Sequence, residues 1–135
     1  NVTNLLAVNP DDDMFDFTQG YCGTLKNCYG VWESDYTSTE ADPRGIEADG
    51  NMDGLYPDHL RQSDFKVENM TIVNNAANTA DNVDRMQDVI KIRRGAKATI
   101  TNALVKGTGG AIDLVDMKDS KGAGNIESSI NITSS

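Results

Sequence analysis

The segment Ile100-Thr101-Asn102-Ala103-Leu104 repeats the pattern of Val2-Thr3-Asn4-Leu5-Leu6 near the start of the chain. Leu25-Lys26-Asn27-Cys28 and Val67-Glu68-Asn69-Met70 fit the same frame, in which an asparagine follows a short β-type segment. A recurring unit of this kind indicates a solenoid, because each coil buries its apolar face only against neighbouring coils. We therefore predict an all-β solenoid of about four coils.

A second kind of strand precedes three of these asparagine positions, as Phe15-Asp16-Phe17, Ile46-Glu47-Ala48 and Ile90-Lys91-Ile92. Apolar and charged residues alternate in it, so the apolar side chains are expected to face inward and the charged ones outward. A further copy, Ile112-Asp113-Leu114, leads to Ile130-Asn131-Ile132-Thr133-Ser134, with Ser134 in the asparagine position.

The corners of each coil have sequence signals of their own. Gly20 and Gly95 follow the first strand at matching positions, where a corner needs a positive φ. Asparagine tolerates a left-handed bend, and its amide can bond to the amides above and below it. Each coil therefore reads as a strand, a turn, a second strand ending at the asparagine and a third strand, with Asn69 facing inward. The predicted ladder consists of Asn4, Asn27, Asn69, Asn102 and Ser134.

The spacing between ladder positions is uneven, and the extra residues fall in four polar segments. Residues 33–43 and 75–87 lie before a first strand, and residues 51–63 and 119–127 lie after one. All four are rich in Asp, Asn, Ser, Thr, Gly or Pro, so we predict that they are loops protruding from the corners. A short helix over residues 78–88 is an alternative.

Composition bounds the domain organisation and the partners. Only 6% of the residues are aromatic and Phe65 is the last of them, which suits a narrow stacked core. The formal net charge of −9 argues against nucleic acid as a partner. No apolar run approaches the roughly 20 residues of a transmembrane helix. We expect residues 1–135 to be a single segment of a longer solenoid, since Asn4 has no strand before it in its own coil.

Stacking the coils in register predicts two columns of outward side chains on the first strands. Lys91 is expected between two acids and Arg93 beside Asp49, where opposite charges in neighbouring strands contribute about 0.2–1 kcal/mol each. One predicted column runs Asp16, Glu47, Lys91, Asp113, and the next runs Thr18, Asp49, Arg93, Val115.

The asparagine ladder and segments such as Pro43-Arg44-Gly45-Ile46-Glu47-Ala48-Asp49-Gly50 and Asp88-Val89-Ile90-Lys91-Ile92-Arg93-Arg94-Gly95 carry a resemblance. The chain resembles the right-handed parallel β-helix of the pectin-lyase-like superfamily, and secreted or surface β-helix proteins of gut anaerobic bacteria. The resemblance implies a secreted or cell-surface bacterial protein associated with polysaccharide. The Asn-Thr-Asp and Gly-His-Gly motifs typical of polygalacturonases are absent.

Polysaccharide-cleaving members of that superfamily work on the outer face of the first sheet. The resemblance makes Asp16, Glu47 and Arg93 the catalytic candidates here. Asp16 and Glu47 would lie one coil apart, about 5 Å, the separation of carboxyl groups in retaining glycosidases. A lyase would instead need a base such as Arg93 or Lys91 and a cation held by carboxylates. We favour a non-catalytic charge ladder that stabilises stacking.

A metal-binding pattern follows the second of the charged strands. Asp49-Gly50-Asn51-Met52-Asp53-Gly54 matches D-x-N-x-D-G, which makes Asp49, Asn51 and Asp53 candidate calcium ligands. Leu60 replaces the glutamate expected at the end of such a loop, so an Asx-rich turn is the favoured interpretation. Asp11-Asp12-Asp13 is interpreted as a solvated turn, and no cofactor other than calcium is predicted.

Aromatic residues gather in or near the first two loops. Trp32, Tyr36 and Tyr56 are candidates for stacking on sugar rings. The alternative for Trp32 is that it pins its loop against the coil. His59 is expected to be a surface residue. Two cysteines six residues apart are interpreted as small buried or turn thiols, with a disulfide as the alternative: Cys22 and Cys28.

These features favour an extracellular or cell-surface binding or structural module that is associated with polysaccharide and has no catalytic activity. The alternatives are a polysaccharide lyase or glycoside hydrolase on the first sheet, and a structural solenoid that self-associates through its open ends.

Overall fold

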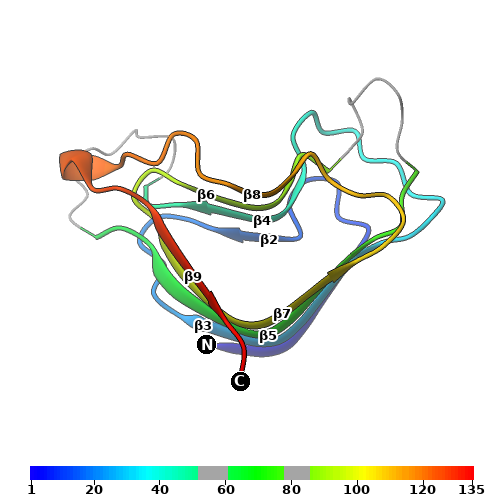
Figure 1. The fold of residues 1–135 in the computed structure, drawn as a ribbon, viewed down its shortest axis with the longest axis horizontal. Coiled ribbons are helices and arrows are strands. Elements are labelled where there is room, and N and C mark those ends of the chain that lie inside the picture. The colour runs from blue at the N-terminus through cyan, green and yellow to red at the C-terminus, as the bar shows by residue number, and fades with distance from the viewer. Residues whose placement is uncertain (52–60, 78–85) are drawn as a thin grey trace.

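A computed structural model describes residues 1–51, 61–77 and 86–135. Two parallel β-sheets face each other, and the chain alternates between them along its length (Figure 1). The only helical element in these ranges is a short 3-10 turn, η2 (Ala123–Asn125). No helix among these residues has the length and apolar character needed to cross a membrane. The architecture is that of an all-β parallel β-helix, as the sequence predicts.

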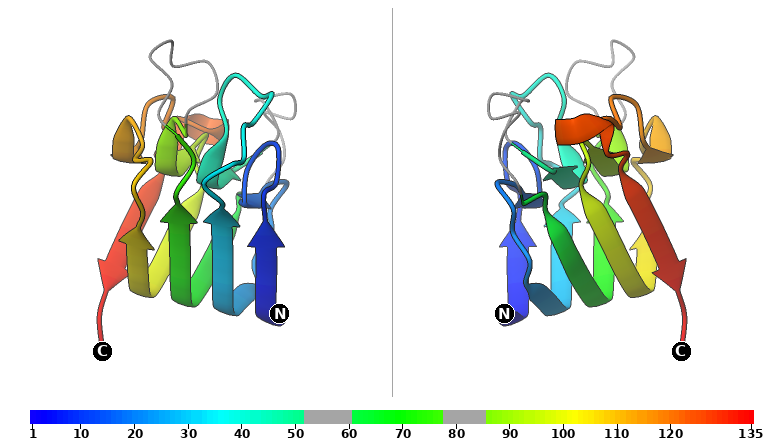
Figure 2. Two further views of the ribbon diagram at one scale, coloured as in Figure 1. Left: turned by 90° about the vertical axis from the view of Figure 1, so that its right-hand side faces the viewer. Right: turned by 90° about the vertical axis from the view of Figure 1, so that its left-hand side faces the viewer.

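The two sheets are assembled from alternate strands of the chain. Neighbouring strands stack side by side in chain order, with the first and last strands at opposite edges (Figure 2). The long sheet contains β1 (Val2–Val8), β3 (Thr24–Trp32), β5 (Asp64–Asn74), β7 (Lys97–Lys106) and β9 (Ser129–Thr133). The short sheet contains β2 (Phe15–Phe17), β4 (Arg44–Asp49), β6 (Asp88–Arg93) and β8 (Asp113–Asp116).

Asparagines bend the long sheet into the V shape seen in Figure 1. Asn4, Asn27, Asn69 and Asn102 have φ values of 62°, 56°, 56° and 59°, in the left-handed region. The strands continue on both sides of each asparagine, so the predicted second and third strands are the two arms of one bent strand. Asparagine is one of the few residues with a side chain that adopts this conformation readily, which explains its recurrence at the bend.

The asparagine amides are hydrogen-bonded in a row from coil to coil. Asn27 Nδ2 donates to Asn4 Oδ1 at 3.1 Å, and Asn69 and Asn102 each donate to the preceding asparagine at 3.0 Å. The prediction that Asn69 faces inward is wrong, because its side chain is exposed on the outside of the bend. At the last coil the amide of Asn102 contacts Ser135 Oγ at 3.1 Å, rather than Ser134.

The core lies between the two sheets and is built from residues in register. Leu25, Val67 and Ile100 occupy matching positions in β3, β5 and β7, and each is at most 6% exposed. Phe17 of β2 stacks on Phe65 of β5 with ring centroids 4.0 Å apart, which joins the two sheets. Burial of each such side chain contributes about 1.5–3 kcal/mol, so the stacked core supplies the main stabilisation.

The register of the short sheet agrees with the prediction in three strands and differs in the fourth. Glu47 lies opposite Asp16 and Lys91, as expected. The prediction for Asp113 is wrong, because Asp116 lies opposite Lys91. Ile112 and Leu114 are 47% and 62% exposed, so they do not face the core although their spacing predicts that they do.

In β8 the residue equivalent to Ile90 is Val115, not the predicted Ile112. Val115 packs against the core opposite Ile90. The sequence prediction that it lies beside Arg93 is therefore wrong. Ile112 is part of the corner, because its N–H group bonds to the carbonyl of Gln87 at 2.9 Å. Corner residues therefore displace the repeat toward the C-terminus in this coil.

Connections between the strands follow the predicted corners. Gly20 and Gly95 have φ values of 76° and 83°, which confirms the two glycine corners. Residues 33–43 connect β3 to β4, and 119–127 fall between β8 and β9. Residues 52–60 and 78–85, which belong to the predicted loops 51–63 and 75–87, lie outside the described ranges. The alternative helix over 78–88 falls mostly on the second of these segments; its last residues, 86–88, are not helical, and β6 begins at Asp88.

We predict that Asn69→Ala lowers the free energy of unfolding by about 2–3 kcal/mol. Alanine pays about 1–2 kcal/mol in the left-handed region, and the row loses amide hydrogen bonds worth about 1 kcal/mol. Asn69→Gly is the control, since glycine adopts the same φ freely and should lose only the amide bonds, about 1 kcal/mol. Equal losses in urea unfolding for the two variants would contradict this account.

Candidate functional site

The outer face of the short sheet carries the largest collection of charged side chains among the described residues. Strands β4 and β6 supply most of them, since outward positions alternate with core positions such as Ile46 and Ile92. Arg44 and Asp88 are the first residues of these two strands and are themselves buried. The group, which we call the charged face, consists of Asp16, Arg44, Glu47, Asp49, Asp88, Lys91, Arg93 and Asp116.

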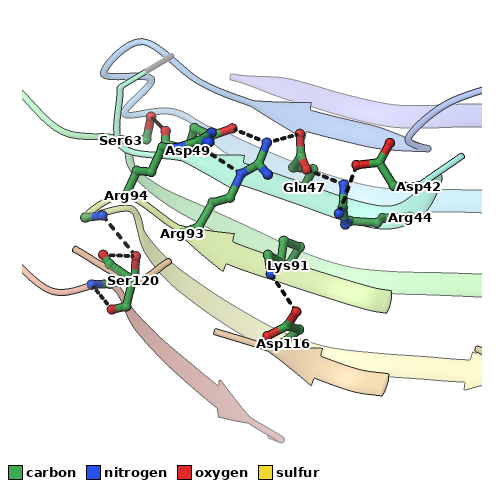
Figure 3. Close-up of polar contacts among 12 residues, drawn as sticks. Asp42, Arg44, Glu47, Asp49, Ser63, Lys91, Arg93, Arg94, Asp116 and Ser120 are labelled. Atoms are coloured by element: carbon green, nitrogen blue, oxygen red, sulfur yellow. Dashed lines mark hydrogen bonds and ion pairs between the residues drawn. The ribbon is translucent and has the colours of Figure 1, made fainter. Parts of the chain in front are cut away.

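Arg93 lies at the centre of the charged face and contacts two acids of the neighbouring strand (Figure 3). Its guanidinium group is 3.0 Å from Glu47 Oε2 and donates to Asp49 through Nε at 2.8 Å and Nη2 at 3.2 Å. Arg94 Nη1 also donates, at 2.8 Å, to Asp49 Oδ1, the oxygen that accepts from Arg93 Nε. The predicted pairing of Arg93 with Asp49 is therefore confirmed.

Further ion pairs join β4 to β6 and β6 to β8. Arg44 contacts Glu47, lies 3.2 Å from Asp42 and 3.0 Å from Asp88. On the other side Lys91 Nζ is 2.5 Å from Asp116 Oδ2. The side chains of Arg44, Asp88 and Lys91 are at most 9% exposed, so these groups are shielded from water and interact strongly.

The three catalytic candidates are brought together on this face. Asp16 and Glu47 are register partners in β2 and β4, and Arg93 contacts Glu47. Burial raises the pKa of Glu47, although Arg44 and Arg93 act to lower it. Burial and the charges of Asp49 and Asp12 also raise the pKa of Asp16. Two adjacent carboxyl groups with raised pKa values are suited to acid-base chemistry.

Arg93 is poorly suited to act as a lyase base. Burial favours its neutral form, but the hydrogen bond to Asp49 and the charges of Asp49 and Glu47 outweigh burial and raise the pKa of Arg93. A base must first lose its proton, and this environment holds the proton on the guanidinium group. Arg93 is therefore a bridge between two carboxylates.

Sequence analysis missed the position of Asp13, which it assigned to a solvated turn. Within the described part of the chain, Asp13 Oδ1 is buried and has no hydrogen-bond partner. Burial, with Glu47 and Asp12 as further causes, raises the pKa of Asp13 to about 8. No signal in the sequence separates Asp13 from its neighbour Asp12, which is exposed.

Of the predicted calcium ligands, Asp49 is already held by two arginines. The side chain of Asn51 is buried, and Asp53 lies outside the described residues. A calcium site in this loop stays a prediction, and it would require Asp49 to release Arg93 or Arg94.

Three carboxylates of the short sheet's last two strands lie close together. Among the described residues, Asp88, Asp113 and Asp116 have oxygens within 4.8 Å of one another. Arg44 and Lys91 already pair with the first and last of these acids. Two basic side chains thus offset part of the negative charge of this group.

Of the aromatic candidates, Trp32 cannot stack on a sugar because it is fully buried. Its indole N–H donates to the carbonyl of Pro10 at 2.9 Å. Tyr36 packs against Trp32 with ring centroids 5.6 Å apart, and its hydroxyl donates to Asp11 at 3.1 Å. The packing of residues 33–43 on the β1–β2 turn therefore covers Trp32 and leaves Tyr36 partly exposed. Tyr56 and His59 lie outside the described residues.

One exposed aromatic ring belongs to the long sheet. Tyr29 is 43% exposed and lies between Leu6 of β1 and Thr71 of β5, with Leu104 of β7 next in register. Leu6 and Leu104 are 64% and 54% exposed. Three strand spacings of about 4.8 Å make this row, which we call the tyrosine row, about 14 Å long.

Both cysteines are free thiols, so the alternative of a disulfide is not observed. Cys22 is exposed in the corner after β2, and Cys28 is buried in the core. The Cys22 thiol accepts a hydrogen bond from Arg61 Nε at 3.2 Å.

Comparison with known proteins identifies one relationship that covers nearly the whole chain. The family model of the pectate-lyase like beta helix domain matches residues 1–134. No curated protein and no solved structure matches the chain. The match agrees with the parallel strands and two sheets described above.

We predict that Asp49→Asn lowers the free energy of unfolding by about 2–4 kcal/mol, because two shielded arginines lose their shared carboxylate. Glu68→Gln is the matched control. Its partner Lys26 is 3.3 Å away, but the two side chains are 51% and 41% exposed, so the loss should stay below about 1 kcal/mol. Similar losses for both variants in denaturant unfolding would show that burial of the network has no special role.

Proposed function

Because the chain belongs to the family of pectate-lyase-like beta helix domains, we propose that it is an extracellular or cell-surface bacterial module that binds polysaccharide without cleaving it. Family membership supports a role connected with polysaccharide. This proposal adds three points: that the protein has no catalytic activity, that it is extracellular or on the cell surface, and that it binds polysaccharide.

The observation that carries the proposal is the tyrosine row. An aromatic ring packs on the apolar face of a sugar, and its hydroxyl bonds to a sugar hydroxyl. Tyr29 offers such a ring on the outer face of the long sheet, with Leu6 and Leu104 exposed in the same row. A row about 14 Å long suits an extended chain of sugars better than a single small molecule.

Ion pairing supports the absence of catalysis. Glu47 contacts two arginines, and Arg93 contacts two carboxylates, so the groups needed for proton transfer are engaged with one another. A net charge of −9 also disfavours an acidic polysaccharide unless cations bridge the two. We therefore propose a neutral polysaccharide as the ligand.

We predict that Tyr29→Ala weakens binding of neutral oligosaccharides by about tenfold, which corresponds to about 1.4 kcal/mol of stacking energy. Calorimetric titration or NMR titration measures the affinity. Lys26→Ala, on the other arm of β3, is the control and should bind as the unmodified protein does. Equal affinity of the Tyr29→Ala variant would place the site elsewhere, and no binding of any polysaccharide would refute the proposal.

A hydrolase or a calcium-assisted lyase on the charged face is the second candidate. The raised pKa values of Asp16 and Glu47 favour it, since a general acid must hold its proton near neutral pH. Such an enzyme should depolymerise neutral or acidic polysaccharides, with or without added calcium. Glu47→Gln should then abolish turnover while Tyr29→Ala retains it. Absence of any cleaved product with the unmodified protein would eliminate this candidate.

A further inference from the structure

A half-buried acid with one buried carboxyl oxygen lies where the first coil turns from the long sheet to the short sheet. Asp13 precedes β2, and the next residue, Met14, is held by a backbone hydrogen bond and by the packing of its side chain. Met14 N–H donates to the carbonyl of Arg44 at 3.0 Å, and its side chain is 6% exposed. Gly30 leaves the space that Met14 fills, because a Cβ atom on Gly30 would approach Met14 Sδ to 2.6 Å. The backbone therefore holds Asp13 against the start of β4.

The surroundings of Asp13 are unfavourable for a negative charge. Its Oδ1 atom is buried without a hydrogen-bond partner in the described part of the chain. The charged groups that act on it are Asp12 and Asp16 from its own turn and strand, and Glu47 and Arg44 from β4. Three of these four groups are acids, so an ionised Asp13 is repelled by most of its neighbours.

The one basic neighbour is already committed to other acids. The guanidinium nitrogens of Arg44 contact Asp42, Glu47 and Asp88. Arg44 lowers the pKa of Asp13, but burial and the neighbouring acids have the larger effect. A proton on the Asp13 carboxyl group removes the repulsion, whereas pairing with Arg44 would break existing bonds.

We propose that Asp13 is a pH-sensitive contact, which packs the β1–β2 turn onto β4 when it is protonated and loosens that turn when it ionises. The cluster of acids and the buried, unpartnered oxygen carry this inference. It does not depend on what the protein binds, and it goes beyond the proposed function.

The direction of the pH effect follows from the two protonation states. Asp13 retains its proton in the folded chain up to about pH 8, whereas an unfolded chain loses it near the usual value of 3.8. The folded state therefore binds more protons between these values, and stability falls as the pH rises through this window. Above the folded pKa the full destabilisation is present.

The first experiment is a carbon-detected NMR titration of the Asp13 carboxyl group in the whole chain. The expected midpoint is about 8. The same titration should show new chemical shifts for Met14 and Phe15 at that midpoint, because the turn loosens. A midpoint near the usual value of an aspartate would overturn the proposal. So would a midpoint near the expected value with no change at these two residues.

Thermodynamic measurements on variants give a second, independent test. Asp13→Asn keeps the shape of a neutral carboxyl group and cannot ionise, so it should fold. Relative to this variant, the unfolding constant of the unmodified protein should grow by at least about tenfold between about pH 6 and pH 9. Asp35→Asn removes an exposed carboxylate from the 33–43 loop and should follow the unmodified protein throughout. Parallel pH profiles for Asp13→Asn and the unmodified protein would refute the inference.

Discussion

The left-handed bend at the ladder asparagines is the constraint on which the rest of the structure depends. Each bend turns a strand of the long sheet so that the chain can return to the short sheet in the same coil. Four asparagines have φ values between 56° and 62°, so successive coils bend at the same point and stay in register. The amides contribute modest hydrogen bonds on the exposed surface, and the conformation itself is the larger effect.

Strict register has an electrostatic consequence for the short sheet. Equivalent residues of successive coils lie about 4.8 Å apart, so a column of acids would repel itself strongly. Arginine and lysine interrupt the columns instead, with Lys91 between Glu47 and Asp116 and Arg93 beside Asp49. The three basic residues thus offset part of the charge of the five acids on the charged face, within a chain whose net charge is −9.

Sequence reasoning recovers the features that depend on local repetition. The bend positions, the glycine corners and the pairing of Arg93 with Asp49 all follow from residues in a common frame. It fails where contacts between segments that are distant in the sequence determine which side chains are buried. Trp32 is buried with its indole N–H bonded to Pro10 of the preceding coil, and the exposure of Leu114 follows from the register of β8, in which Val115 lies opposite Ile90. The buried carboxyl group of Asp13 depends on β4, which no pattern within its own turn indicates.

The spacing between ladder asparagines has an evolutionary consequence. Consecutive members are separated by 23, 42 and 33 residues, yet the strands on which they lie remain paired throughout. Much of the variation in length falls between the strands, in connecting segments such as residues 33–43. A gene encoding this architecture can therefore gain or lose whole surface segments by insertion and deletion. New recognition surfaces can arise in this way while the coil itself is inherited intact.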